Sequence, residues 1–235
     1  ADLVMQSQKL TQCVVMCCLS MDDLQRALGF HTAADMIRGA TTPFTQSTNT
    51  NNTINNTNNG DSKTQTSNNT NPQPQSTTQS TTQSTTQSTT ASSSSSSERS
   101  ARAQSLYSLL GETWEEKTGV QKHTTDVLLT YVKEPLIGTR HGVYDLMAAV
   151  AGVSSGWGLR VLFSHTDFVN YIFDRRTETE KPSKEWKFAV LSAAYRSPAV
   201  SILLGPKVAE RLQKFLQDGP FYAETAAATV AMGVR

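Results

Sequence analysis

Two stretches decide the predicted fold of this chain: SGWGLRVLFSHTDFVNYI, which starts at Ser155, and SPAVSILLGPKVAERLQKFL, which starts at Ser197. Each begins with a serine, continues through a short apolar segment and a turn, and then enters a second segment whose apolar residues have helical spacing. The two copies predict a repeated unit made of helices.

A third copy, SMDDLQRALGFHTAADMI, starts at Ser20. Alignment with the second copy places Leu28 and Ile37 at the positions of Phe163 and Ile172. We therefore expect all four side chains to lie in the core, where truncation to Ala would destabilise the fold by roughly 2 to 5 kcal/mol.

The segments before the three serines also look alike, as QKLTQCVVMCCLS, HGVYDLMAAVAGVSS and EWKFAVLSAAYRS. Each has small residues on one helical face, and Cys13 and Cys17 take the places of Ala148 and Gly152, which predicts a tight helix contact. The copies at Ser155 and Ser197 are 42 residues apart (197 minus 155). That is the period of armadillo and HEAT repeats. We predict an all-α, armadillo/HEAT-like α-solenoid.

A low-complexity insert interrupts this pattern. Asn, Thr, Ser and Gln dominate from Thr41 to Ser97, and the motif STTQ recurs in tandem. Such a segment cannot bury enough apolar surface to fold. We expect a repeat unit at residues 1–40, a disordered insert at residues 41–101, further repeats at residues 102–222 and a flexible tail at residues 223–235. Three N-x-T sequons inside the insert are read as chance matches in an Asn/Thr-rich tract.

Composition narrows the function classes. The net charge of +1 gives no basic excess that would favour nucleic acid or an anionic membrane, and no run of 18 apolar residues is present. The chain starts inside an apparent helix, so we expect it to be the C-terminal part of a longer protein. Cysteines occur only at Cys13, Cys17 and Cys18, which suits a reducing, intracellular compartment better than a disulfide framework.

Two short motifs suggest enzymes, but their surroundings do not fit. Gly152-Val-Ser154-Ser-Gly156 matches the G-x-S-x-G nucleophile elbow, which needs a strand before the serine and then an acid and a histidine later in the chain. Here the preceding segment has helical spacing. Gly156-Trp157-Gly158 begins like a dinucleotide-binding fingerprint but lacks the third glycine. We interpret it as a turn between helices with Trp157 packed inside.

The titratable residues form no recognisable site in the sequence. The four histidines, His31, His123, His141 and His165, lack zinc-ligand spacing. We interpret the charged segment around Glu178 as a solvated helix end, and Lys184, Glu185 and Lys187 as exposed charges. We therefore expect no catalytic residues, no metal and no cofactor, and no protein-binding residue can be assigned from the sequence.

The segments DFVNYIFDRRTETEKPSKEWKFAVLSAA and LLGPKVAERLQKFLQDGPFY resemble the C-terminal region of the 26S proteasome non-ATPase regulatory subunit 5 family. The resemblance is best over residues 155–222, extends more weakly upstream to about Arg102, and finds no counterpart for the insert. It implies an armadillo/HEAT solenoid that acts as a chaperone in assembly of the proteasome base. Such a chaperone binds the C-terminal domain of one ATPase subunit and keeps it from docking prematurely on the core particle.

The resemblance also implies a non-catalytic protein in the cytoplasm, with the nucleus as a second location, and partners among base precursor complexes rather than nucleic acid or membranes. Two other classes stay open. One is a generic armadillo scaffold with a different protein client. The other is an enzyme whose catalytic domain lies in a preceding part of the protein.

Overall fold

The computed structural model describes residues 2–41 and 91–222, and the regular elements in these ranges are all α-helices. In chain order they are α1 (Asp2–Cys18), α2 (Asp23–Thr41), α3 (Ala91–Thr118), α4 (Thr124–Val132), α5 (Ile137–Ala151), α6 (Trp157–Phe163), α7 (Thr166–Phe173), α8 (Lys181–Tyr195) and α9 (Val200–Asp218). The predicted all-α class is confirmed. Most of the predicted insert and the whole predicted tail lie outside the described residues.

The border of the insert differs from the prediction. Helix α3 begins at Ala91, so residues 91–101, which composition placed in the disordered insert, form its first turns. The apolar side chains that anchor α3 start at Ala103 and continue through Leu106 and Leu110, all buried. Once these residues fix the helix, extending it backwards adds one hydrogen bond for each residue ordered, which the polar composition does not prevent.

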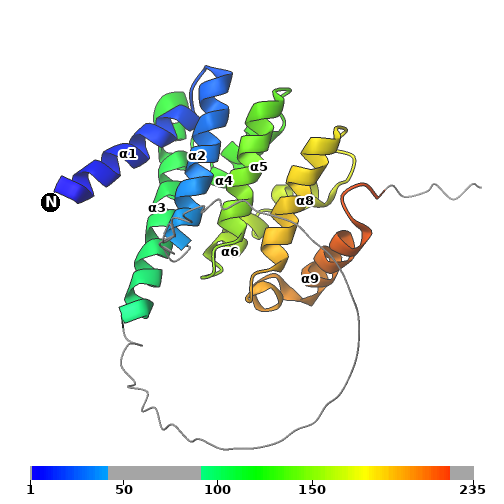
Figure 1. The fold of residues 1–235 in the computed structure, drawn as a ribbon. Coiled ribbons are helices and arrows are strands. Elements are labelled where there is room, and N and C mark those ends of the chain that lie inside the picture. Colours follow the sequence, from blue (N-terminus) through cyan, green and yellow to red (C-terminus); the bar gives the residue numbers. More distant parts are fainter. Residues whose placement is uncertain (1, 42–90, 223–235) are drawn as a thin grey trace, which may run out of the picture.

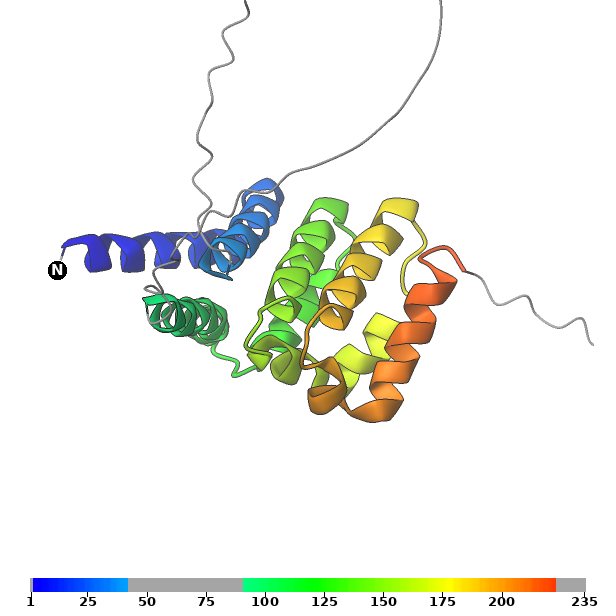
Figure 2. The same cartoon turned by 60° about the horizontal axis from the view of Figure 1, so that its bottom comes forward.

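The helices form two layers. Helices α2, α5 and α8 lie side by side in the first layer, where α2 packs on α5 and α5 packs on α8 (Figure 1). Behind them, α4 contacts α5 and α7, and α9 contacts α6 and α8 (Figure 2). Each group of helices thus buries its apolar side against the next group, which is the arrangement expected of an α-solenoid.

The order of the helices can be compared over the period of 42 residues. The short helix α6 and the longer α7 follow Ser155, and α9 repeats this order after Ser197 because Gly205, with a φ of 74°, kinks it into a short first part and a longer second part. The short first helix α6 packs on α9. The two copies that start at Ser155 and Ser197 are therefore neighbours in the stack.

The alignment of the first copy was wrong. Helix α2, and not α1, lies beside α5, so the alignment is displaced by one helix. Leu28 is 64% exposed, whereas Ile37 is fully buried. The core face of α2 consists instead of Phe30, Ala33, Ala34 and Ile37, which follow the i, i+3, i+4, i+7 spacing of a helix. Because consecutive helices share this spacing, the pattern alone could not distinguish α1 from α2.

The three cysteines of α1 differ in their exposure to solvent. Cys13 is exposed, so its predicted role in a helix contact is wrong. Cys17 does lie in a tight contact, because a Cβ atom added at Gly29 of α2 would come within 3.0 Å of the Cys17 Cβ atom. Cys18 is buried, and burial raises the pKa of its thiol far above the ordinary value. The same added atom would lie 2.5 Å from the Cys18 backbone nitrogen, so the close contact between α1 and α2 depends on the glycine at position 29.

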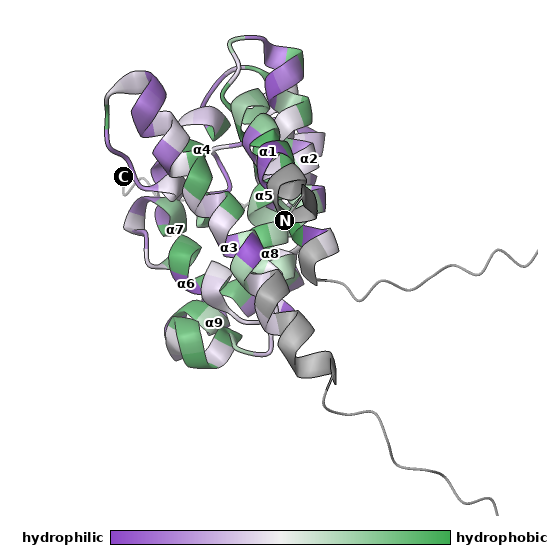
Figure 3. Ribbon diagram, turned by 90° about the vertical axis from the view of Figure 1, so that its left-hand side faces the viewer, coloured by the Kyte–Doolittle hydropathy of each residue, from purple (hydrophilic) through white to green (hydrophobic). Residues whose placement is uncertain are grey.

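Figure 3 shows hydrophobic segments on helices of both layers, including α4, α7 and α9. The largest fully buried side chains likewise come from both layers, among them Tyr144, Phe30 and Phe168. None of the helices within residues 2–41 and 91–222 combines the length and the apolar character that a membrane crossing requires.

Candidate protein-binding surface

The G-x-S-x-G motif lies in a turn that follows a helix. Helix α5 ends at Ala151, and Ser154 is exposed in the turn that leads to α6. The nucleophile elbow needs a strand at this place. The structure therefore does not provide the local geometry that would activate Ser154.

The Gly-Trp-Gly segment is a packing contact between helices. A Cβ atom added at Gly158 would lie 1.9 Å from the carbonyl oxygen of Val150, so α6 approaches the α5 backbone as closely as only glycine permits. Trp157 is buried and packs edge-on against Tyr107, with ring centroids 5.7 Å apart. The predicted role of this segment as an interhelix turn with Trp157 packed inside is confirmed.

The structure brings the four histidines together in two places that the sequence did not reveal. His123 and His165 stack at 5.7 Å between ring centroids, and His165 Nε2 lies 3.1 Å from Asp126 Oδ1. His31 and His141 each lie against Trp186, at 5.8 Å and 5.9 Å between ring centroids. Within the part of the chain that the structure describes, no cluster of three or more His, Cys, Asp or Glu side chains could hold a metal ion.

The second of these places belongs to a row of side chains that crosses the whole first layer. We call it the front strip and define it by five residues: His31 and Arg38 from α2, His141 and Asp145 from α5, and Trp186 from α8. The side chains of His31 and Arg38 are 37% and 40% exposed, and Trp186 is half-buried. The strip therefore presents an indole, imidazole rings and a guanidinium at least partly to solvent.

One carboxylate holds the α2 side of the strip. Asp145 accepts a charge-assisted hydrogen bond from Arg38, and its Oδ2 lies 2.7 Å from His31 Nδ1. The Asp145 side chain is only 9% exposed, while both partners reach solvent. We call these three residues the front network. It fixes α2 against α5 and orients two of the side chains that face outwards.

His141 connects the strip to α8. Its Nε2 is 3.0 Å from the hydroxyl of the buried Ser183. Burial, with the nearby positive charge of Arg140 as the next cause, lowers the pKa of His141 below 6.5. The ring is therefore mostly neutral near pH 7, which suits its stacking on Trp186.

A second polar cluster, which we call the loop network, lies beneath the connection between α7 and α8. Glu178 Oε1 accepts hydrogen bonds from Tyr144 and Tyr171 at 2.5 Å and 2.9 Å, and Glu178 Oε2 lies 3.4 Å from Arg140 Nη1. Lys187 is 3% exposed and donates from Nζ to the carbonyl oxygens of Tyr171 and Asp174 at 2.7 Å and 2.5 Å, and to the hydroxyl of Thr177 at 2.6 Å.

The prediction that Glu178 and Lys187 are solvated charges was therefore wrong. Both are buried because each finds several partners that do not follow a short sequence pattern. Lys184 is half-buried and Glu185 is exposed, so they differ from Lys187 on the same helix. Burial lowers the pKa of Lys187 to about 8, which leaves it largely protonated near pH 7.

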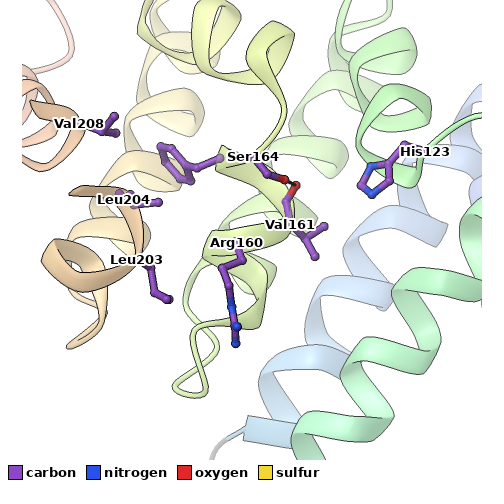
Figure 4. Close-up of a pocket in the computed structure, with 8 residues that line it drawn as sticks. His123, Arg160, Val161, Ser164, Leu203, Leu204 and Val208 are labelled. Carbon is purple, nitrogen blue, oxygen red and sulfur yellow. Dashed lines mark hydrogen bonds between the residues drawn. The ribbon is translucent and has the colours of Figure 1, made fainter.

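An apolar cavity of about 390 Å³ lies between α6 and α9. Figure 4 shows Leu203, Leu204 and Val208 on one side, His123 on the other, and Arg160, Val161 and Ser164 between them. The Ser164 hydroxyl donates to the carbonyl oxygen of Val161 at 3.2 Å, so it is engaged within its own helix turn. This lining can accept an apolar side chain, and it does not join a nucleophile to a base.

Comparison with known proteins assigns a family. The sequence model of the family described as "Proteasome non-ATPase 26S subunit" matches residues 76–235, which is well over half of the chain. The chain belongs to this family. The match includes α3 to α9 and therefore the α5 and α8 parts of the front strip.

Individual members give the same result over a shorter span. The mouse 26S proteasome non-ATPase regulatory subunit 5 is 32% identical over 77 residues, which cover 33% of this chain and 15% of the mouse protein. The bovine and human proteins of the same name are each 30% identical over 77 residues, again 33% of this chain and 15% of each relative. The aligned part thus spans about one seventh of these relatives. No solved structure matches the chain.

Proposed function

We propose that this protein is a non-catalytic chaperone for assembly of the 26S proteasome base, and that it holds the C-terminal domain of one base ATPase subunit on the front strip. The family match and the named relatives support a role connected with the proteasome. The resemblance seen in the sequence supports the finer role in assembly. The free cysteines favour the reducing cytoplasm as its place of action, with the nucleus as a second.

The observation that carries this proposal is the front strip itself. Tryptophan and arginine are the side chains that most often dominate the energetics of protein interfaces. Here Trp186 and Arg38 lie on different helices of one layer. The front network holds Arg38, and Trp186 lies against the rings of His31 and His141. A row of fixed side chains across three helices matches the surface of a folded domain better than a small ligand.

The experiment is a pull-down of the purified protein against the isolated C-terminal domain of each base ATPase, without nucleotide. One domain should be retained. Nucleotide should not be needed, because the C-terminal domain lies outside the nucleotide site. Trp186→Ala should abolish retention while the thermal melting curve still shows a folded protein. Base precursors should contain the protein and mature 26S particles should not.

Tyr195 provides a matched control on the same helix. It is 41% exposed and lies about two and a half turns beyond Trp186, which places it on the opposite side of α8. Tyr195→Ala should leave retention unchanged. Retention of none of the domains, or persistence of the protein in mature particles, would leave a generic scaffold with another client as the better description.

A further inference from the structure

The end of the stack carries a second surface that the front strip does not include. A cleft of about 1120 Å³ opens between the α7–α8 connection and the second part of α9, and we call it the C-terminal cleft. Its lining combines aromatic rings, among them Phe173, Phe215 and Tyr222, with basic side chains of α8 and α9. It is larger than the cavity between α6 and α9 and much more polar.

The walls of the C-terminal cleft are held in place. The loop network fixes the α7–α8 connection from below, through Lys187 and Glu178. Arg175 joins this connection to the end of α9, because it donates to the carbonyl oxygens of Gly219 and Phe215 at 2.6 Å and 3.1 Å. Its guanidinium also lies 3.7 Å from the centroid of the Phe215 ring. The cleft is therefore formed before any partner arrives.

The charge inside the cleft is unbalanced. Its carboxylates are engaged: Asp218 lies 3.5 Å from Arg175, Asp174 lies 3.1 Å from Arg176, and Glu178 belongs to the loop network. The basic residues Lys184, Arg211 and Lys214 also line the cleft. Within residues 2–41 and 91–222, none of these three has a carboxylate within salt-bridge distance.

Apolar surface accompanies these charges. Phe221 and Tyr222, at the rim, are 50% and 45% exposed, and the Arg211 guanidinium lies 4.3 Å from the centroid of the Phe173 ring. A ligand that suits this lining needs negative charges for Lys184, Arg211 and Lys214 and an apolar group for the rings. Complementary charge would also steer such a ligand towards the cleft.

We propose that the C-terminal cleft binds an acidic peptide segment of a partner protein, with its carboxylates on Lys184, Arg211 and Lys214 and an apolar side chain against Phe221 and Tyr222. Nucleic acid fits less well, because its closely spaced phosphates call for a longer basic track than three residues. The net charge of +1 shows no wider basic excess that could extend such a track. This site is separate from the front strip and does not depend on the proposed client.

The test uses fluorescence anisotropy of a short, labelled peptide in which Glu alternates with Phe. The purified protein should bind it, and binding should weaken as salt increases. Arg211→Glu and Lys214→Glu should each weaken binding by roughly tenfold. Lys207→Glu makes the same charge change on the exposed surface of α9 outside the cleft, and it should have little effect.

Several results would overturn the proposal. Absence of binding, or an equal loss for Lys207→Glu and Lys214→Glu, would show that no specific site exists for an acidic peptide. Equal binding of a peptide with Lys in place of Glu would remove the role of charge. Tighter binding of a single-stranded oligonucleotide would assign the cleft to nucleic acid. Displacement of the probe by a peptide of residues 223–235 at lower concentration would assign it to the chain's own tail.

Discussion

The front network and the loop network use the same chemical group in different surroundings. In the front network, Asp145 is 9% exposed, but its partners His31 and Arg38 are 37% and 40% exposed. In the loop network, Glu178 is 1% exposed and its partner Arg140 is 16% exposed. Water can replace a lost partner in the first case but not in the second. Loss of a charged partner should therefore cost less stability in the front network than in the loop network.

The difference also separates two structural roles. The front network leaves the side chains of His31 and Arg38 partly exposed at the surface. The loop network leaves almost nothing at the surface and instead fixes the connection that forms one wall of the C-terminal cleft. Burial raises the pKa of Tyr171 to about 12 and that of Tyr144 further, so both hydroxyls remain donors to Glu178 at any ordinary pH. Similar side chains thus form a partly exposed network on one part of the stack and a buried support on another.

The largest effect is expected from Lys187→Met. It removes the hydrogen-bond donors of three oxygens in a partly buried site and takes away a positive charge close to Glu178. Removing one partner from a buried ionic interaction typically costs about 3 to 5 kcal/mol. We expect the free energy of unfolding to fall by that amount. Urea unfolding near pH 7 measures it.

Glu185→Gln is the matched control, because Glu185 is an exposed charge on the same helix. Its free energy of unfolding should differ from that of the unmodified protein by less than about 0.5 kcal/mol. If Lys187→Met were equally mild, the loop network would contribute little and the contrast between the two networks would disappear.

A smaller effect is expected from Asp145→Asn. The amide retains one oxygen acceptor but loses the negative charge that faces Arg38 and His31. Because both partners can turn to water, we expect a loss of about 1 to 3 kcal/mol in the free energy of unfolding. Asp35 contacts Arg38 from a site that is 75% exposed, so Asp35→Asn should change it by less than about 0.5 kcal/mol. Equal losses for both substitutions would show that burial of Asp145 does not matter.

The apolar residues of the chain were easier to place from the sequence than the charged residues of the two networks. The spacing of apolar residues was enough to predict an all-α chain and the packing of Trp157 between helices. It did not distinguish α1 from α2, since both carry small residues and apolar residues at helical spacing. Once α2 was aligned with the wrong helix, the exposed Leu28 was assigned to the core, although Phe30, two positions further on, is the buried residue.

The two polar networks could not be predicted for a different reason. His31 and Asp145 are separated by more than a hundred positions, and only the packing of α2 on α5 brings them together. Lys187 and Glu185 are charged residues of the same short segment, yet Lys187 is buried and Glu185 is exposed. Composition describes the average setting of a charged residue, whereas its actual setting depends on which carbonyl oxygens and hydroxyls the fold places within reach.

The smallest expected effect is a pH dependence that originates at His141, between the two networks. Its pKa in the folded protein is lowered by burial and then by Arg140, against an ordinary value of 6.5. The unfolded chain therefore binds a proton at a higher pH than the folded protein does. Stability increases with pH wherever the unfolded state holds more protons. As pH falls through 6.5 towards the lower folded pKa, His141 should thus reduce stability.

His141→Gln isolates this contribution, because glutamine can still hydrogen bond to Ser183 but does not titrate. Melting temperatures of the unmodified protein and the variant would be compared between pH of about 7.5 and about 5.5, a range that brackets the ordinary histidine pKa. The melting temperature of the unmodified protein should fall further over this range than that of the variant. Subtracting one curve from the other cancels the contribution of the other histidines, which both proteins share. Parallel curves would mean that the folded protein protonates His141 as readily as the unfolded chain does. The imidazole would then be solvated rather than held between Arg140, Ser183 and Trp186, and the α8 side of the front strip would lack the fixed geometry that binding requires.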